Sequence, residues 1–93
     1  MKVVDISIAA MALEELLNAI DMYPQYGGFV TEEEWKNTEM LKYIIVRYVP
    51  EGNLKILKIA STWQPLAFHT LAQASAFMLD FKPTIKRYYM FNV

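Results

Sequence analysis

Residues 41–61 read LKYIIVRYVPEGNLKILKIAS, and this stretch decides the fold more clearly than any other part of the 93-residue chain. Two runs rich in Ile, Val, Leu and Tyr, residues 41–49 and 54–61, flank the Pro-Glu-Gly-Asn tetrapeptide at 50–53. β-Branched and aromatic residues favour strands, whereas Pro, Gly and Asn favour tight turns. The stretch therefore predicts an antiparallel β-hairpin.

The turn also predicts which side chains share a face of the hairpin. It places Val49 opposite Leu54 and Arg47 opposite Ile56, and side chains alternate between the faces along each strand. One face then carries Ile44, Val46, Tyr48, Lys55, Leu57 and Ile59. The other carries Tyr43, Ile45, Arg47, Val49, Leu54, Ile56, Lys58 and Ala60. We expect the first face to lie beneath helices, because its one cation is near its end, and the second face to stay open.

The segments on either side of the hairpin carry one strand pattern and one helix pattern each. Residues 2–8 alternate apolar and polar side chains as a half-buried strand does, whereas residues 9–23 repeat apolar residues at helical spacing. A helix that reaches back to Asp5 is the alternative, although it would place this carboxylate in the apolar stripe. After the hairpin we expect a helix from Pro65 to about Phe81, stopped by Pro83, and a final strand over residues 85–93.

The connection between the first helix and the hairpin contains a turn and a helix-start signal. Tyr26-Gly27-Gly28-Phe29 lies in the longest loop, where it is either a plain turn or the edge of a ligand cleft between the first helix and the sheet. Thr31 and Glu34 have the spacing of a capping box. They predict a short extra helix near residues 31–37 that carries Trp35.

The predicted order is strand, helix, strand, strand, helix, strand, which is the ferredoxin-like βαββαβ arrangement. We therefore expect a single α+β domain over residues 1–93, with an antiparallel sheet and two helices on one sheet face. The chain contains no cysteine, so it has no disulfide framework. The longest uncharged stretch near the start, residues 6–13, is too short for a membrane span, and we expect no membrane partner and a cytoplasmic location.

Sequence motifs for catalysis, cofactors or metals are not found. The chain has no Gly-rich phosphate loop and no Gly-x-Ser-x-Gly elbow, and its single histidine, His69, excludes a site that needs two. His69 falls on the polar stripe of its predicted helix, as surface histidines do. The acidic run at 32–34 suits a helix N-terminus better than a cation site. We expect no catalytic residue, no cofactor and no metal ion.

An open sheet face that is mostly apolar predicts self-association. Monomers rarely expose apolar patches larger than a few hundred Å², and twofold dimers are the commonest soluble assemblies. The expected dimer interface consists of Tyr43, Ile45, Arg47, Val49, Leu54, Ile56 and Lys58. The first hypothesis for function is therefore a small interaction or regulatory module that acts as a homodimer or higher oligomer through its sheet. A further protein partner would meet its acidic helical surface or the loop at residues 26–29.

The sequence also supports two alternative hypotheses for function. Single-stranded nucleic acid is held by cations interleaved with aromatic rings, a combination offered here by Arg47, Lys58, Lys86, Arg87, Tyr43 and Tyr88. The chain is slightly acidic overall, with a pI near 5.7, which is unusual for such proteins. The other alternative is a small-molecule or enzyme pocket inside a dimeric α+β barrel formed by two open sheets.

Overall fold

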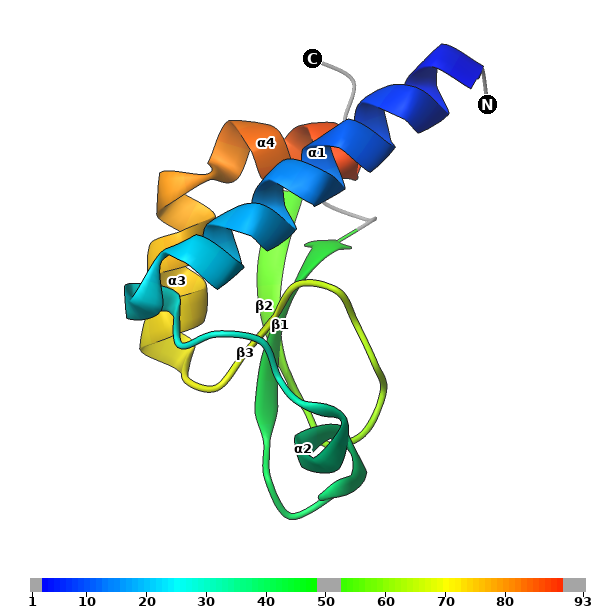
Figure 1. The fold of residues 1–93 in the computed structure, drawn as a ribbon. Helices are drawn as coiled ribbons and strands as arrows, with labels where there is room; N and C mark the ends of the chain where they lie inside the picture. Colours follow the sequence, from blue (N-terminus) through cyan, green and yellow to red (C-terminus); the bar gives the residue numbers. More distant parts are fainter. Residues whose placement is uncertain (1–2, 49–52, 90–93) are drawn as a thin grey trace.

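The predicted hairpin supplies two of the three described strands, and its first strand is the central strand of the sheet (Figure 1). The computed structural model describes residues 3–48 and 53–89. Its elements in chain order are α1 (Val3–Met22), the 3₁₀ turn η1 (Pro24–Tyr26), α2 (Glu32–Lys36), β1 (Lys42–Tyr48), β2 (Asn53–Ile59), β3 (Ala67–Phe68), α3 (Leu71–Asp80) and α4 (Lys82–Tyr88). The three described strands form an antiparallel sheet in the order β2-β1-β3. The prediction of an α+β fold with an antiparallel sheet is confirmed.

The predicted hairpin is confirmed, but its register is shifted by two residues. Arg47 pairs with Leu54 and Ile45 pairs with Ile56, whereas the turn had predicted that Arg47 pairs with Ile56. A shift of two residues leaves every side chain on its predicted face, because side chains alternate with a period of two. Val49 and residues 50–52 of the turn lie outside the described residues.

The predicted first strand is wrong, and the alternative of a longer helix is right. Residues 3–22 form one helix, α1, which ends beside Tyr23 as predicted. A helix satisfies its backbone hydrogen bonds internally, whereas a strand at this end of the chain needs a neighbouring strand. The segment expected to form the final strand is helical up to Tyr88, so among the described residues no such neighbour is found; residues 90–93 lie outside them.

The long helix predicted from Pro65 begins only at Leu71. Before it, Ala67 and Phe68 form the short strand β3, which pairs with Ile44 and Tyr43 of β1. Thr70 is the N-cap: its hydroxyl accepts from Gln73 N, and the Gln73 side chain accepts from Thr70 N, each at 3.1 Å. This second capping box is the start signal that the sequence interpretation missed.

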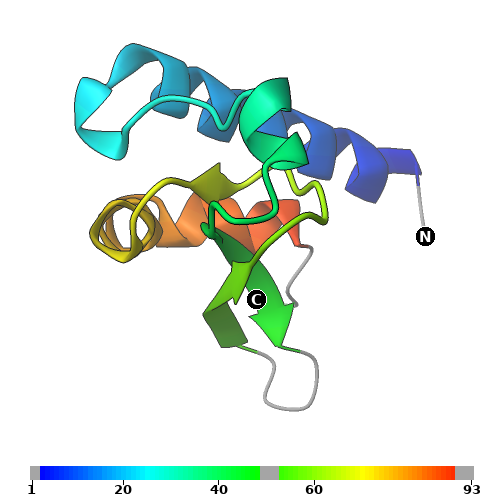
Figure 2. The ribbon, with the colours of Figure 1, turned by 90° about the horizontal axis from the view of Figure 1, so that it is seen from below.

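Pro83 starts a helix instead of stopping one. The chain bends at Phe81, and Pro83 then lies in the first turn of α4, where its missing N–H needs no partner. The order of elements therefore differs from the predicted ferredoxin-like βαββαβ order. α1 packs across α4, and α3 contacts all three strands (Figures 1 and 2).

None of the described helices combines the length and the apolar character needed to cross a bilayer.

Phe77 lies where several elements meet in the core. Its ring contacts Tyr26 of η1 edge to face at 4.9 Å, Phe68 of β3 at 5.0 Å and Phe81 at 4.7 Å between ring centroids. Ile45, in the central strand, is fully buried in the same cluster. The remaining fully or nearly fully buried members are Leu16, Ala19 and Ile20 of α1, Leu66, Ala74 of α3 and Ile85 of α4.

A polar contact and a close approach hold η1 against α3. Tyr26 is buried, and its hydroxyl donates a 2.5 Å hydrogen bond to Asp80 Oδ2. Burial, with a smaller effect of the Asp80 carboxylate, raises the pKa of Tyr26 to about 12. Gly27 follows at φ 85°, and a Cβ there would lie 2.4 Å from Gln73 Nε2. Only glycine meets both conditions without strain.

Replacing Phe77 should test the importance of this aromatic cluster. We expect Phe77→Ala to lower the free energy of unfolding by about 3–5 kcal/mol, because it removes a ring that contacts three others. Phe77→Leu should lose less. Leu79→Ala is the matched control, since Leu79 lies on the same helix with 76% of its surface exposed, and should change stability by less than about 0.5 kcal/mol. Urea denaturation measures all three; equal losses for Phe77→Ala and Leu79→Ala would contradict the assignment.

Candidate functional site

The face of the hairpin that was expected to be open is covered by the chain's own helices. Ile45 is fully buried in the core, and Tyr43, Leu54 and Ile56 pack against it. The prediction of which face lies beneath the helices is therefore wrong. The cations on this face are accommodated at its margins: Arg47 Nη1 donates to Tyr89 O at 3.2 Å. The alternative of a pocket inside a dimeric barrel stays a prediction, and it would have to use the other face of the hairpin, on which Tyr48 and Leu57 are exposed.

Lys58 is the other cation on this covered face. Its ammonium lies 5.9 Å from the centroid of the Tyr43 ring. Val49, the remaining member of the predicted dimer interface, lies outside the described residues. Self-association stays a prediction. However, Ile45, Leu54 and Ile56, apolar members of the predicted interface, pack in or against the chain's own core.

The predicted nucleic-acid residues belong to two elements, which meet where Arg47 donates to Tyr89 O. Arg47, Lys58 and Tyr43 lie on the hairpin, whereas Lys86, Arg87 and Tyr88 lie on α4. Tyr43 and Tyr88 are both partly buried against the core cluster, and burial raises the pKa of Tyr88. Neither ring is therefore fully exposed for stacking on a base. Nucleic-acid binding stays a prediction.

The candidate site with the clearest shape is an apolar pocket between α1, α2 and the connection from β2 to β3. Its volume is about 280 Å³. Residues 27–30, between η1 and α2, form what we call the glycine loop. The lining of the pocket consists of Leu13 and Leu17 of α1, Phe29 and Val30 of the glycine loop, Trp35 of α2, Trp63, Gln64 and Pro65 of the β2–β3 connection, and Ala67 of β3. Segments far apart in the sequence meet here. We call it the aromatic pocket.

The aromatic pocket exposes large apolar side chains that a folded chain normally buries. Trp63 keeps 66% of its surface exposed and Phe29 keeps 45%, while Trp35 is half-buried. Single exposed apolar residues are common on protein surfaces, whereas several converging on one hollow are a feature of binding sites. Gln64 supplies the one side-chain amide among the described lining residues. The pocket is therefore suited to apolar ligands.

Local sequence signals position the wall that carries Trp35. Thr31 caps α2: its hydroxyl accepts from Glu34 N at 3.2 Å, and Glu34 Oε1 accepts from Thr31 N at 2.8 Å. The same carboxylate oxygen lies 3.1 Å from His69 Nε2, next to β3. The hydrogen bond from the Thr31 backbone, and then the contact with His69, lower the pKa of Glu34. His69 thus joins α2 to the segment that follows β3. The sequence analysis had instead predicted that His69 lies on the solvent-exposed side of a helix.

A buried lysine holds the two tryptophan-bearing walls together. Lys42 has no exposed surface, and its Nζ donates to Asn37 O at 2.8 Å and to Ala60 O at 2.6 Å. Asn37 is the C-cap residue of α2, and Ala60 opens the connection that leads to Trp63. The ammonium also lies 5.6 Å from the centroid of the Trp35 ring. Lys42 is therefore a tie between the walls, consistent with the rule that buried charges are hydrogen-bonded.

The sequence anticipated part of this pocket. Phe29 belongs to the glycine loop that was considered as the edge of a cleft beside the first helix, and it does line a hollow with Leu13 and Leu17 of α1. Trp63 was expected to precede a helix and Lys42 was not singled out. Their positions depend on the β2–β3 connection, whose path no local motif specifies.

Comparison of the chain with family models, with curated proteins and with solved structures finds no match.

The Glu34 contacts predict a defined pH dependence of stability. The pKa of Glu34 is lowered in the folded state from 4.5, so its charged form contributes stability above that value, and the contribution is lost as the pH falls through the folded pKa. We expect Glu34→Gln, which keeps a capping side chain but removes the charge, to be less stable than the wild type near neutral pH. The difference should shrink as the solution is acidified below 4.5. Urea denaturation across this range measures it, with Glu33→Gln as the neighbouring control; a pH-independent difference would refute the assignment.

The role of Lys42 is tested by a side chain of similar length without charge. Lys42→Met leaves the Asn37 and Ala60 carbonyls without their donor. We expect a loss of about 1.5–3 kcal/mol in the free energy of unfolding, and a shift of the Trp35 indole resonance, because charge-assisted hydrogen bonds have this magnitude. Lys36→Met is the control: Lys36 forms an exposed pair with Glu32 and should change stability by less than about 0.5 kcal/mol. Similar effects from both variants would be evidence against the tie.

Proposed function

We propose that this protein is a non-catalytic interaction module that binds a partner protein by enclosing one large apolar side chain in the aromatic pocket. The observation that carries the proposal is the convergence of Phe29, Trp35 and Trp63 on one apolar hollow, with Trp63 largely exposed to solvent. Tryptophan and other aromatic residues are enriched among the few residues that dominate binding energy at protein interfaces.

The lining of the aromatic pocket supports an apolar side-chain anchor. Its volume, about 280 Å³, is near the lower end of the roughly 300–1,000 Å³ typical of ligand sites. Its walls supply many apolar contacts and few polar ones, so they favour a Phe, Leu or Met side chain over a charged or strongly polar group. The ligand class that fits best is therefore an exposed segment of another protein with one such anchor.

The walls of the pocket are held in place before any partner arrives. The capping box of α2, the contact between Glu34 and His69, and the two hydrogen bonds of Lys42 all restrain the segments that carry the aromatic rings. A binding surface that is already ordered loses less conformational entropy on association. This pre-organisation supports recognition of a partner by a small contact.

Charge beside the pocket suggests which residues flank the anchor. Glu32 and Glu33 follow Val30 after one residue, and both are exposed in the first turn of α2. Opposite charges at the rim of an interface speed encounter and select partners more than they add affinity. A partner segment with Lys or Arg beside its apolar anchor matches this arrangement.

A peptide titration tests the proposal directly. Short Gly- and Ser-rich peptides with flanking lysines and a central Phe or Leu are added to ¹⁵N-labelled protein. We expect them to shift the indole resonances of Trp35 and Trp63, and Trp63→Ala to weaken binding by about tenfold or more, as for a central interface residue.

Matched controls separate pocket binding from general stickiness. A peptide with a central Asp should cause no shift, and Leu71→Ala, which alters an exposed apolar side chain that does not line the pocket, should leave binding unchanged. The proposal fails if apolar-centred peptides leave both indole resonances in place, or if Trp63→Ala binds them as the wild type does.

A further inference from the structure

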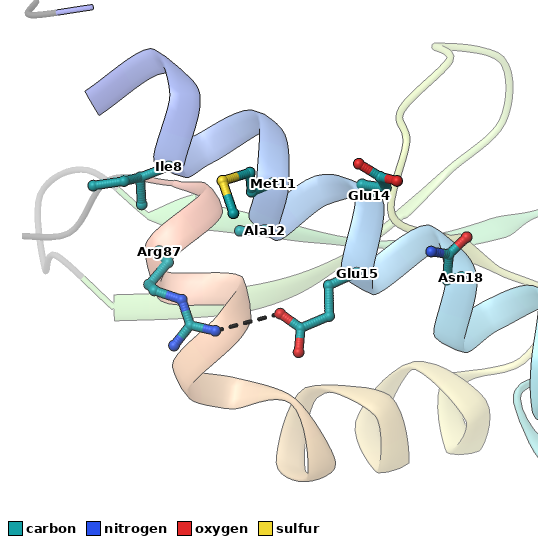
Figure 3. A pocket seen from close by; sticks show the side chains of 7 residues that line it. All are labelled: Ile8, Met11, Ala12, Glu14, Glu15, Asn18 and Arg87. Carbon is teal, nitrogen blue, oxygen red and sulfur yellow. Dashed lines mark hydrogen bonds and ion pairs between the residues drawn. The ribbon is translucent and has the colours of Figure 1, made fainter. Parts of the chain in front are cut away.

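A second surface, formed by α1 and α4, has a different chemistry from the aromatic pocket. Between the two helices lies a groove of about 440 Å³ (Figure 3). Its lining consists of Ile8, Met11, Ala12, Glu14, Glu15 and Asn18 of α1 and Arg87 of α4. Met11 has 69% of its surface exposed and Ile8 has 45%, so part of this surface is apolar and uncovered. We call it the helix-pair surface.

Charges of opposite sign are segregated on the two helices of this surface. α1 contains acidic residues and no basic residue along Val3–Met22, whereas α4 contains Lys82, Lys86 and Arg87 and no acidic residue. A second hollow on α4, of about 400 Å³, is lined by these three cations and Pro83. The surface therefore has an acidic helix, a basic helix and exposed apolar side chains beside them.

The two halves already attract each other within one chain. Arg87 Nη2 lies 3.4 Å from Glu15 Oε2, with both side chains about half exposed, and Figure 3 shows the guanidinium reaching toward α1. Glu14, which lines the groove, and Lys82, which lines the hollow on α4, are both exposed. The surface can thus offer a carboxylate and an ammonium group to a molecule that lies across both helices.

A partner with a single sign of charge matches only half of the helix-pair surface. A nucleic acid would meet the cations of α4, but the carboxylates of Glu14 and Glu15 would repel it from the groove. A basic peptide would meet the reverse problem on α4. Neither would gain from covering Met11 and Ile8 unless it also carried apolar groups.

A second copy of the same surface matches all three parts. With a twofold axis through the groove, α1 of one copy faces α4 of the other, and acidic residues face basic residues twice. Ile8 and Met11 of each copy are then covered by the partner copy. We propose that the helix-pair surface is a self-association site, at which two chains pack α1 against α4 of the partner copy about a twofold axis.

This association leaves the aromatic pocket accessible. Leu13 and Leu17 point into the pocket, while Met11, Glu14 and Asn18 line the groove, so the two sites use different sides of α1. Trp63→Ala should therefore leave self-association unchanged, and the failure of either proposal would not imply the failure of the other.

Charge reversal tests the proposal through the wild type and two complementary variants. The wild type should sediment as a dimer at tens of micromolar and low salt, and should shift toward monomer at high salt, because the contacts include exposed charges. Glu14→Lys leaves like charges facing each other in a homodimer, and so does Lys82→Glu. We expect each variant alone to associate about tenfold or more weakly, or not at all.

An equimolar mixture of the two variants gives the decisive result. In a mixed pair, the cation introduced by Glu14→Lys faces the anion introduced by Lys82→Glu, and the native Lys82 of the first chain faces the native Glu14 of the second, so the mixture should recover the dimer that neither variant forms alone. Glu33→Lys, an exposed reversal on α2, should dimerise as the wild type does. Circular dichroism melting curves should confirm that all the variants are folded.

Three outcomes would overturn the proposal. A wild type that remains monomeric at all concentrations and salt levels shows no self-association. Variants that dimerise as well as the wild type place the dimer contact on another surface. A monomeric wild type that binds a single-stranded oligonucleotide, with a salt dependence that Lys82→Glu reduces, assigns the α4 cations to nucleic acid.

Discussion

The packing of Phe77 against Tyr26, Phe68 and Phe81 is the interaction on which the rest of the structure depends. It joins α3 to the β3 edge of the sheet and to η1, three segments that have no backbone hydrogen bonds in common beyond their local turns. Because the Tyr26 hydroxyl also donates a hydrogen bond to Asp80, the start of the glycine loop is held against α3. The direction in which that loop leaves determines where Phe29 stands, so the aromatic pocket depends on the core.

α1 shows how one helix can serve a core and two surfaces. Ala12, Leu16, Ala19 and Ile20 are buried, Leu13 and Leu17 border the aromatic pocket, and Met11, Glu14, Glu15 and Asn18 line the groove beside α4. Successive residues of a helix are rotated by about 100°, so neighbours in sequence face different surroundings. A helix of 20 residues is long enough to hold all three sets. Its mixed pattern of apolar residues on several sides follows from these separate contacts.

The two proposed sites together describe a bivalent adaptor. A twofold dimer through the helix-pair surface would carry two aromatic pockets on one particle, and linked sites can raise the overall affinity for a partner with two anchors well above that of one pocket. The small volume of a single pocket would then be less limiting. Both sites rely on side chains that the core leaves exposed, Trp63 in the pocket and Met11 in the groove.

What the sequence by itself determined is local. The hairpin, the turn at Gly27, the end of α1 near Tyr23 and the capping box of Thr31 and Glu34 each depend on residues a few positions apart, so their signals can be found without the rest of the chain. The second capping box, at Thr70, carried an equally local signal that the more conspicuous Pro65 obscured. Both faces of the hairpin were composed as predicted, because a register shift of two residues preserves alternation.

Only the tertiary structure decided which face of the hairpin the helices cover, that residues 3–8 and 85–88 are helical and not extended, and that Trp35 and Trp63 line one pocket. It also decided that Lys42 ties Asn37 to Ala60. A period-2 pattern of a few residues fits a strand only if another strand lies beside it, and the availability of that neighbour depends on the fold as a whole. Likewise, a lysine is buried only where backbone carbonyls from two distant segments converge on its ammonium group. These outcomes depend on contacts between residues far apart in the chain, and no window of neighbouring residues contains them.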